Sequence, residues 1–206
     1  MIARRYWLLI PALLAAFGCS EAPKEAAAKK EPAKPPEPVT GRYAFYQMFP
    51  AARAWAVDVQ PIQITSIPLK DVPAAKGKYG AWQCVFVSPG KGRMKTYSYS
   101  VIEAGGSLHQ GVFALPDERF SGSLGQAKPF LVAALKIDSD EAYETAVKKS
   151  EDYMKKFPNT PIMFQLELTP RFPDPAWRVI WGESVGSSNH SIFVDATTGA
   201  YLATAR

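Results

Sequence analysis

The sequence of 206 residues predicts an α+β fold made of two tandem units, each a helix packed on an antiparallel β-sheet. The main observation is an internal repeat, because residues 42–113 and 138–204 carry the same landmarks in the same order. Each copy has a helix candidate, a strand that begins with Pro-Ile, a strand that begins with Ala-Trp, and further strands separated by turns. The short turns favour antiparallel pairing, since parallel strands need connections of roughly a dozen residues or more.

The two Ala-Trp strands anchor the comparison of the copies. They begin at Ala81-Trp82 and at Ala176-Trp177, after turn regions of different length. Differences between repeats are tolerated best in such loops. We therefore expect Trp82 and Trp177 to be structural residues at equivalent places, packed under the two helices.

The helix of the second copy has the clearest sequence signals. Asp138 or Ser139 can cap its N-terminus, and Glu141 stands three positions after Asp138, which is the spacing of a capping box. Pro158 predicts that the helix ends at Phe157. One side of this helix carries a stripe at helical period that is expected to face the core: Tyr143, Ala146, Val147, Ser150, Met154 and Phe157.

The helix of the first copy is less regular. Thr40 can cap it, and Pro50 predicts a kinked or split helix, because proline removes a hydrogen-bond donor and clashes with the preceding turn. The packing candidates on this helix are Tyr43, Phe45, Tyr46, Met48, Phe49, Ala52, Trp55 and Ala56. Core packing is their expected role, although the aromatic density also suits contact of Tyr43, Tyr46 or Phe49 with a partner.

The second copy ends in a turn between two alternating strands. In Asp195-Ala-Thr-Thr-Gly199 the aspartate can accept hydrogen bonds from the turn backbone, and the glycine supplies a positive φ. The flanking runs then form a hairpin. Asp195 and Gly199 are therefore expected to be structural residues.

A family resemblance rests on this hairpin together with the strand before it. The strand contains Trp-Arg-Val at 177–179, and the hairpin has Ile-Phe-Val-Asp-Ala-Thr-Thr-Gly-Ala-Tyr-Leu at 192–202. This combination resembles the PepSY domain over residues 138–204, whereas the first copy matches only in outline, with Val-Ile-Glu-Ala-Gly-Gly at 101–106 in place of the turn. The resemblance implies a helix followed by an antiparallel sheet. It also implies a role like that of protease propeptides and exported proteins for which inhibition or modulation of peptidases has been proposed.

The N-terminus indicates where the protein resides. It carries Arg4 and Arg5, then an apolar run over residues 6–17, and then Cys19 after a glycine. This order resembles a bacterial lipoprotein signal. The resemblance implies that residues 1–18 are a signal peptide and that lipid on Cys19 anchors the chain to a membrane on its extracytoplasmic side.

The residue after the cysteine refines this expectation. A serine directly after the cysteine, here Ser20, resembles the lipoproteins that reach the outer membrane and face the periplasm, if the host is Gram-negative. An ordinary cleaved signal and an uncleaved anchor remain as alternatives. The apolar run of about 12 residues is nevertheless shorter than the roughly 20 that a spanning helix needs.

Residues 19–40 are expected to form the lipidated cysteine and a disordered tether. The segment is rich in Pro, Ala, Lys and Glu and has no aromatic residue, so it cannot bury enough apolar surface to offset the entropy of ordering. The remaining chain is expected to form two PepSY-like units, at residues 41–125 and 126–206.

Few residues suggest catalysis or a metal site. His109 and His190 differ in their positions relative to the repeat, and no Cys or His spacing is typical of a metal site, so neither a metal nor a cofactor is expected. Cys84 lies in an apolar strand and is expected to be buried. Asp195, Ser184 and His190 could form a triad, but the turn needs Asp195 and no Gly-x-Ser-x-Gly motif is present.

The charge pattern argues against nucleic-acid binding. The formal net charge is +5, which falls by two units when Arg4 and Arg5 leave with the signal peptide, and no long basic run is present. Lys91, Arg93 and Lys95 flank a Pro-Gly turn. We expect them to form a solvated hairpin tip, and the alternative is contact with an acidic partner or a phosphate.

These features favour a non-catalytic envelope lipoprotein that acts as a binding or regulatory module. The candidate partners are an envelope peptidase or a peptide, together with the membrane through the lipid on Cys19. The alternative is a structural or assembly lipoprotein of the envelope without a link to peptidases. An enzyme is the least favoured class, because each candidate acid, base or thiol has a better structural role.

Cys19→Ser is expected to remove the membrane anchor, because the thiol is the site of lipid attachment in the signal that this N-terminus resembles. Cell fractionation and mass measurement of the variant should find it outside the membrane fraction or still carrying residues 1–18. A variant that is fully processed and still bound to the membrane would show that Cys19 carries no lipid.

Overall fold

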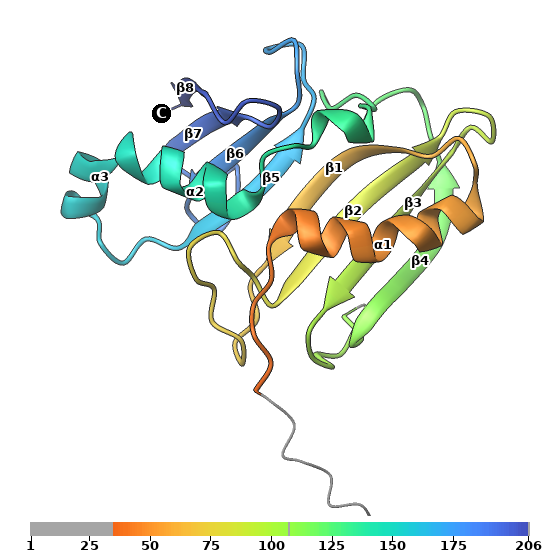
Figure 1. Cartoon of the computed structure of the whole chain (residues 1–206), viewed down its shortest axis with the longest axis horizontal. Helices are drawn as coiled ribbons and strands as arrows, with labels where there is room; N and C mark the ends of the chain where they lie inside the picture. The colour runs from red at the N-terminus through yellow and green to blue at the C-terminus, as the bar shows by residue number, and fades with distance from the viewer. Residues whose placement is uncertain (1–34, 107, 206) are drawn as a thin grey trace, which may run out of the picture. The chain divides into compact units, whose positions relative to one another are not determined.

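Eight antiparallel strands form one continuous sheet in the order β4-β3-β2-β1-β5-β6-β7-β8 (Figure 1). The computed structural model describes residues 35–106 and 108–205, so the expected signal peptide, Cys19 and most of the expected tether lie outside the described residues. The helices are α1 (Gly41–Trp55), the 3-10 turn η1 (Val132–Ala134), α2 (Ser139–Lys148) and α3 (Glu151–Lys156). The strands are β1 (Gln60–Ile67), β2 (Ala81–Ser88), β3 (Arg93–Ser100), β4 (Gly111–Arg119), β5 (Ile162–Glu167), β6 (Ala176–Trp181), β7 (His190–Asp195) and β8 (Tyr201–Ala205).

The fold is α+β and consistent with two units, each with a helix followed by four strands. Helix α1 packs on the first four strands, and α2 packs on strands of the second half. The two halves do not keep separate sheets, because β1 and β5 pair with each other in the middle. This pairing gives both inner strands a hydrogen-bonded neighbour on each side.

The strand register relates the two halves by an approximate two-fold axis through the pair Thr65–Gln165 on β1 and β5. Trp82 lies opposite Ser66 on β1, one residue after Thr65. Trp177 lies opposite Leu166 on β5, one residue after Gln165. The two tryptophans therefore occupy corresponding positions on corresponding strands.

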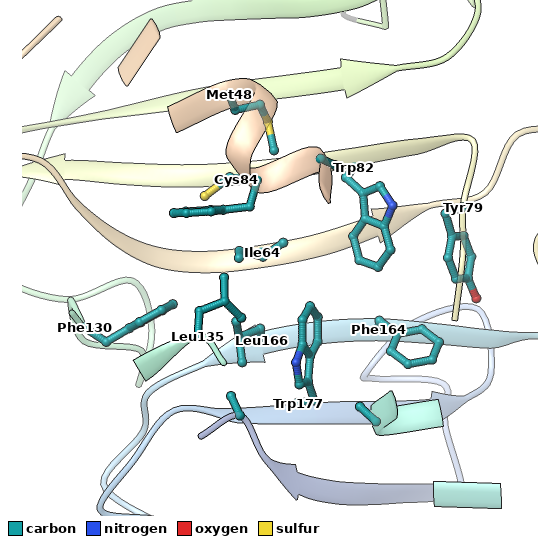
Figure 2. Packing of buried hydrophobic residues seen from close by; sticks show 14 of the residues in the cluster. Met48, Ile64, Tyr79, Trp82, Cys84, Phe130, Leu135, Phe164, Leu166 and Trp177 are labelled. Atoms are coloured by element: carbon teal, nitrogen blue, oxygen red, sulfur yellow. The ribbon is translucent and has the colours of Figure 1, made fainter. Parts of the chain in front are cut away.

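Each tryptophan holds the start of one helix. The indole N–H of Trp82 donates to the carbonyl of Val39 at 2.9 Å, and that of Trp177 donates to the carbonyl of Ile137 at 2.9 Å. Val39 and Ile137 both stand immediately before the N-cap of a helix. The two indole rings meet edge to face with centroids 6.2 Å apart, at the centre of the core (Figure 2). The buried contact between the two rings joins the halves, while each indole hydrogen bond stays within its own half.

Side chains at the start of α2 also cap the N-terminus of α1. The backbone N–H of Gly41 donates to the hydroxyl of Ser139 at 2.8 Å, and the N–H of Arg42 donates to the carboxylate of Asp138 at 2.9 Å. The Ser139 hydroxyl in turn donates to the carbonyl of Gly77 at 2.7 Å. Side chains at the start of α2 thus satisfy amides at the start of α1 that have no partner within the helix.

Helix α1 confirms the predicted cap and corrects the predicted break. Thr40 is the N-cap and accepts from the N–H of Tyr43 at 3.3 Å. The helix is not split at Pro50, which lies inside an uninterrupted α-helix. Because Pro50 has no N–H, the carbonyl of Tyr46 lacks its helical hydrogen-bond donor. Both residues are exposed, so water can donate the missing hydrogen bond. The opposite side of α1 is held by buried residues: Ala44, Phe45, Met48 and Ala52.

The second helix begins as predicted but does not continue to Phe157. Asp138 and Glu141 form the predicted capping box. The helix then breaks into α2 and α3, because the Ser150 hydroxyl is held by His190 of β7 at 2.8 Å. Ser150 faces the core while Phe157 is exposed, so the expected single stripe is divided between two short helices.

The core lies between the two helices and the sheet, and it is continuous across both halves (Figure 2). Cys84 is buried in it, as predicted, and burial raises the pKa of its thiol well above the ordinary value. A smaller apolar cluster lies on the opposite face of the sheet and is covered by the segment after β4: Ile62, Val85, Val87, Ala127, Met94, Phe120 and Leu124.

Gly41→Ala is expected to destabilise the fold, although alanine is normally favoured over glycine in helices by about 1 kcal/mol. A Cβ at this position would lie 2.7 Å from the ring of Trp177 and 3.1 Å from that of Trp82. Overpacking of this kind costs about 1–3 kcal/mol. Urea unfolding measures the effect, with Gly186→Ala as the control because a Cβ there has no heavy atom within 4 Å. A Gly41→Ala protein as stable as the wild type would refute this packing.

Candidate functional site

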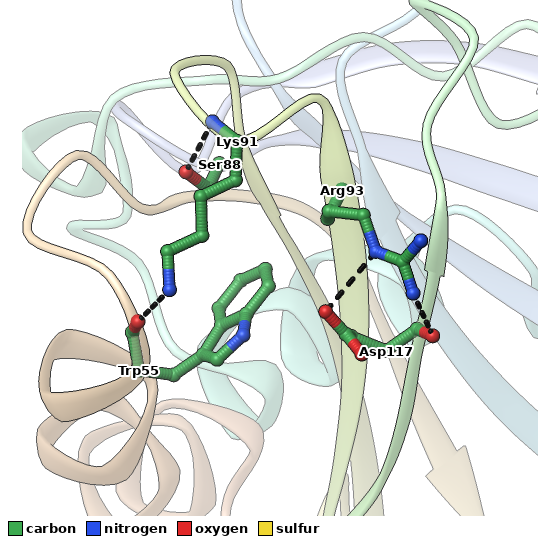
Figure 3. A network of polar contacts seen from close by, with 5 residues as sticks. All are labelled: Trp55, Ser88, Lys91, Arg93 and Asp117. Atoms are coloured by element: carbon green, nitrogen blue, oxygen red, sulfur yellow. Dashed lines mark hydrogen bonds and ion pairs between the residues drawn. The ribbon is translucent and has the colours of Figure 1, made fainter.

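Two of the three predicted basic residues of the β2–β3 hairpin, Lys91 and Arg93, have partners within the fold (Figure 3). The ammonium group of Lys91 donates to the carbonyl of Trp55 and lies 5.2 Å from the centre of its ring. The guanidinium of Arg93 binds Asp117 of β4 through its carboxylate at 3.1 Å and its carbonyl at 2.7 Å. Lys91 and Arg93 are thus used within the fold.

The turn of the β2–β3 hairpin is held by Asp58, a residue outside the hairpin. Asp58 accepts from the Ser88 hydroxyl and from the N–H of Gly90, both at 2.6 Å. These two hydrogen bonds, the one from Ser88 first, lower the pKa of the Asp58 carboxyl. The remaining basic residue, Lys95, lies 5.7 Å from the ring centre of Tyr97. Contact of the hairpin with a partner therefore stays a prediction.

Asp195 and Gly199 lie in the β7–β8 turn. The Asp195 carboxylate accepts from the N–H groups of Thr197 at 2.7 Å and Thr198 at 2.8 Å. Gly199 has φ +77°, and its N–H donates to the Asp195 carbonyl at 2.9 Å. The carboxylate is thus committed to the turn backbone.

The triad considered from the sequence is not assembled. Asp195 and His190 stand at opposite ends of β7, and the Ser184 hydroxyl contacts that of Ser187 at 2.8 Å in the preceding loop. The structure instead brings Ser150 to His190, a pairing for which the sequence offers no spacing signal. Ser150 is only 2% exposed, so its hydroxyl is poorly placed to attack a substrate and serves to hold the helix break.

His190 forms part of an aromatic cluster at the edge of the largest of four cavities. Its ring stacks on Tyr153 with centroids 4.3 Å apart and meets Trp181 at 5.0 Å. The cavity of about 560 Å³ is also lined by Lys148 and Lys156. The N–H of the buried Trp181 ring has no acceptor within the described part of the chain.

Three smaller cavities lie elsewhere. One of about 300 Å³ lies beside Tyr79, and one of about 280 Å³ lies beside Phe130. The third, of about 220 Å³, lies next to Val39 at the start of the fold. Burial raises the pKa of the Tyr79 phenol, whose hydroxyl donates to the carbonyl of Ile162, so this group holds β5 rather than serving as a base.

The described residues, 35–106 and 108–205, contain no group of three or more His, Cys, Asp or Glu side chains placed to hold a metal ion. His109 instead contacts the Glu103 carboxylate at 2.6 Å. The N–H of Gln110 and then His109 lower the pKa of Glu103. None of the helices in this part of the chain is long and apolar enough to cross a membrane.

The face of the sheet away from the helices carries one row of side chains across all eight strands. Successive residues of a strand point to opposite faces, so the neighbours of the buried Trp82 and Trp177 belong to this second face. Starting from β4, the register places these residues side by side: Phe113, Ser98, Gln83, Thr65, Gln165, Arg178, Phe193 and Ala203. The middle of the row is polar and half-buried to buried, with Phe113 at one end and Phe193 next to Ala203 at the other.

The two outer strands differ in how well they can accept another strand. Strand β4 contains Pro116, which lacks an N–H, and the charged residues Asp117, Glu118 and Arg119. Proline and charge are common ways of protecting a sheet edge. Strand β8 has the sequence Tyr-Leu-Ala-Thr-Ala and contains neither.

Comparison with protein-family models, curated proteins and solved structures finds no match to this chain. The functional argument therefore depends on the residues and surfaces described above.

Gly199→Val is expected to cost about 1–3 kcal/mol, because a β-branched residue is strained at positive φ. Gly186→Val is the matched control, since Gly186 lacks a positive φ and a side chain there would enter open space. Thermal unfolding should show a lower melting temperature for Gly199→Val alone. Equal melting temperatures for the two variants would mean that the Asp195–Gly199 turn does not depend on glycine.

Proposed function

We propose that this protein is a non-catalytic binding or regulatory module of the bacterial envelope, tethered to the membrane by lipid on Cys19. Its partner is an extended segment of an envelope peptidase or another peptide, which adds to the sheet next to β8. The proposal includes the assignment of the two halves as PepSY-like units. The order of one helix followed by four antiparallel strands in each half, and the Asp195–Gly199 turn, support that assignment.

The unprotected edge at β8 is the observation that carries the proposal. Alternate backbone N–H and C=O groups of an outer strand face away from its only neighbour. A peptide in extended conformation can satisfy them, and the backbone hydrogen bonds supply affinity. The opposite edge, β4, interrupts this pattern at Pro116. The sheet therefore offers β8 as its better acceptor of a strand.

The candidate chemical groups support a binding role over a catalytic one. Asp195 is hydrogen-bonded within its turn, Ser150 is buried against His190, and Cys84 lies in the core with a raised pKa. A nucleophile has to reach its substrate and needs a base beside it. Each of these groups is committed to the fold instead.

Thr204→Lys is expected to weaken partner binding about tenfold, because a lysine on an outer strand disfavours addition of another strand. Thr204 lies opposite Ile192 on the helix side of β8. The matched control is Ala114→Lys on β4, where Ala114 lies opposite Tyr97 on the same side of the other edge. Each full-length protein is solubilised in detergent and immobilised through its lipid. Envelope extract is then passed over it, and the bound proteins and their peptidase activity are measured.

The proposal expects a peptidase or peptide to bind the wild type and Ala114→Lys, and about tenfold less of it to bind Thr204→Lys, as for loss of a few hydrogen bonds. Equal retention by all three would exclude the β8 edge. Recovery of assembly proteins or cell-wall material, with proteolysis unchanged, would favour the structural lipoprotein instead.

A further inference from the structure

Two arginines converge on one aromatic ring on the helix-free face of the sheet. Arg178 of β6 lies beside Phe193 of β7 in the cross-strand row, and its guanidinium carbon is 5.4 Å from the centre of that ring. Arg171, from the β5–β6 loop, places its guanidinium carbon 4.5 Å from the same centre. Arg171 also lies 5.2 Å from the ring of Phe172. We call Arg171, Arg178, Phe172 and Phe193 the arginine patch.

Neither arginine of the patch has an anionic partner in the described part of the chain. No ion pair or hydrogen bond of either side chain occurs among residues 35–106 and 108–205, and Nε of Arg178 is shielded from solvent without an acceptor. The nearby carboxylate of Glu167 accepts from the side chains of Gln63 at 3.3 Å and Gln165 at 2.7 Å instead. The guanidinium groups thus keep most of their hydrogen-bonding capacity.

The positive charge of Arg178 lies in a half-buried place beside the like charge of Arg171, and the Glu167 carboxylate offsets only part of these effects. Burial lowers the pKa of the Arg178 guanidinium from its ordinary value; Glu167 acts in the opposite direction, and the like charge of Arg171 lowers it further. Arg178 nevertheless stays protonated at neutral pH because arginine is so basic. An anion bound to the accessible nitrogens of the two guanidinium groups would relieve the repulsion between them.

We propose that the arginine patch is a docking site for exposed aspartate or glutamate side chains of a partner protein. A carboxylate matches the planar guanidinium group and can accept two hydrogen bonds from it. Phe193 contacts both cations and Phe172 contacts Arg171, and such cation–π contacts help to hold the guanidinium groups in place.

The surroundings of the patch point to a carboxylate on a protein surface. Neither arginine lines any of the four cavities described above, and Arg171 lies on the exposed surface of the protein. The patch also continues the cross-strand row, whose polar middle offers further hydrogen-bonding groups. Arginine and aromatic residues are enriched where proteins bind one another. This surface is separate from the helix-side face of β8 that the first proposal uses for its test.

The site is tested with the full chain in detergent and a dye-labelled hexaglutamate peptide, with binding followed by fluorescence anisotropy. A hexaglutamine peptide of the same length reports uncharged binding. Arg171→Gln and Arg178→Gln are the test variants, and Arg119→Gln on β4 is the matched control because it removes the same charge from another exposed arginine. Circular dichroism checks that each variant is folded. If Arg178→Gln fails to fold, Arg171→Gln still tests the site, because Arg171 lies in an exposed loop.

Hexaglutamate is expected to bind the wild type and to bind each test variant about tenfold more weakly, as for loss of a charge-assisted hydrogen-bonded pair. Arg119→Gln should change the affinity by less than about twofold, which is typical of a distant surface charge. An equal loss of affinity in Arg119→Gln would show that binding depends on net charge alone, and it would overturn the proposal. Absence of binding to the wild type, or equal binding of hexaglutamine, would overturn it as well.

Discussion

The contact between Trp82 and Trp177 is the interaction on which the rest of the structure depends. The two rings meet at the approximate two-fold axis, and each indole N–H holds the residue before one helix. The helix starts therefore come together, where Asp138 and Ser139 cap amides of α1. Because both helices are fixed by this one contact, they lie on the same face of the sheet, and β1 and β5 are placed side by side to pair.

This arrangement determines which surfaces are left for binding. One face of the sheet is covered by helices and holds the core, so the other face carries the cross-strand row and the arginine patch. Joining the halves through β1 and β5 also removes two potential edges and leaves only β4 and β8. Pro116 interrupts β4, so the open edge is β8 in the second half of the protein. The arginine patch also lies in the second half. A partner that uses both would contact the second half of the protein.

The sequence was informative where local chemistry decides the structure and weaker where distant residues meet. The capping box at Asp138, the burial of Cys84 and the matching positions of Trp82 and Trp177 follow from periodicity and from the repeat. The helix break at Ser150 did not, because it depends on His190, which is 40 residues away. The joined sheet depends on β1–β5 pairing, for which neither strand carries a local signal. The arginine patch was missed for the same reason, since Arg171, Arg178 and Phe193 are brought together only by the register of β6 and β7.

A double-mutant cycle between Trp82→Leu and Trp177→Leu tests most directly whether this contact joins the two halves. Urea unfolding of the wild type, both single variants and the double variant gives the coupling free energy between the two positions. A direct contact between aromatic rings predicts a coupling of about 0.5–1.5 kcal/mol and a single unfolding transition in the wild type. Additive effects within about 0.3 kcal/mol, together with separate unfolding of the two halves, would show that the halves are stabilised independently.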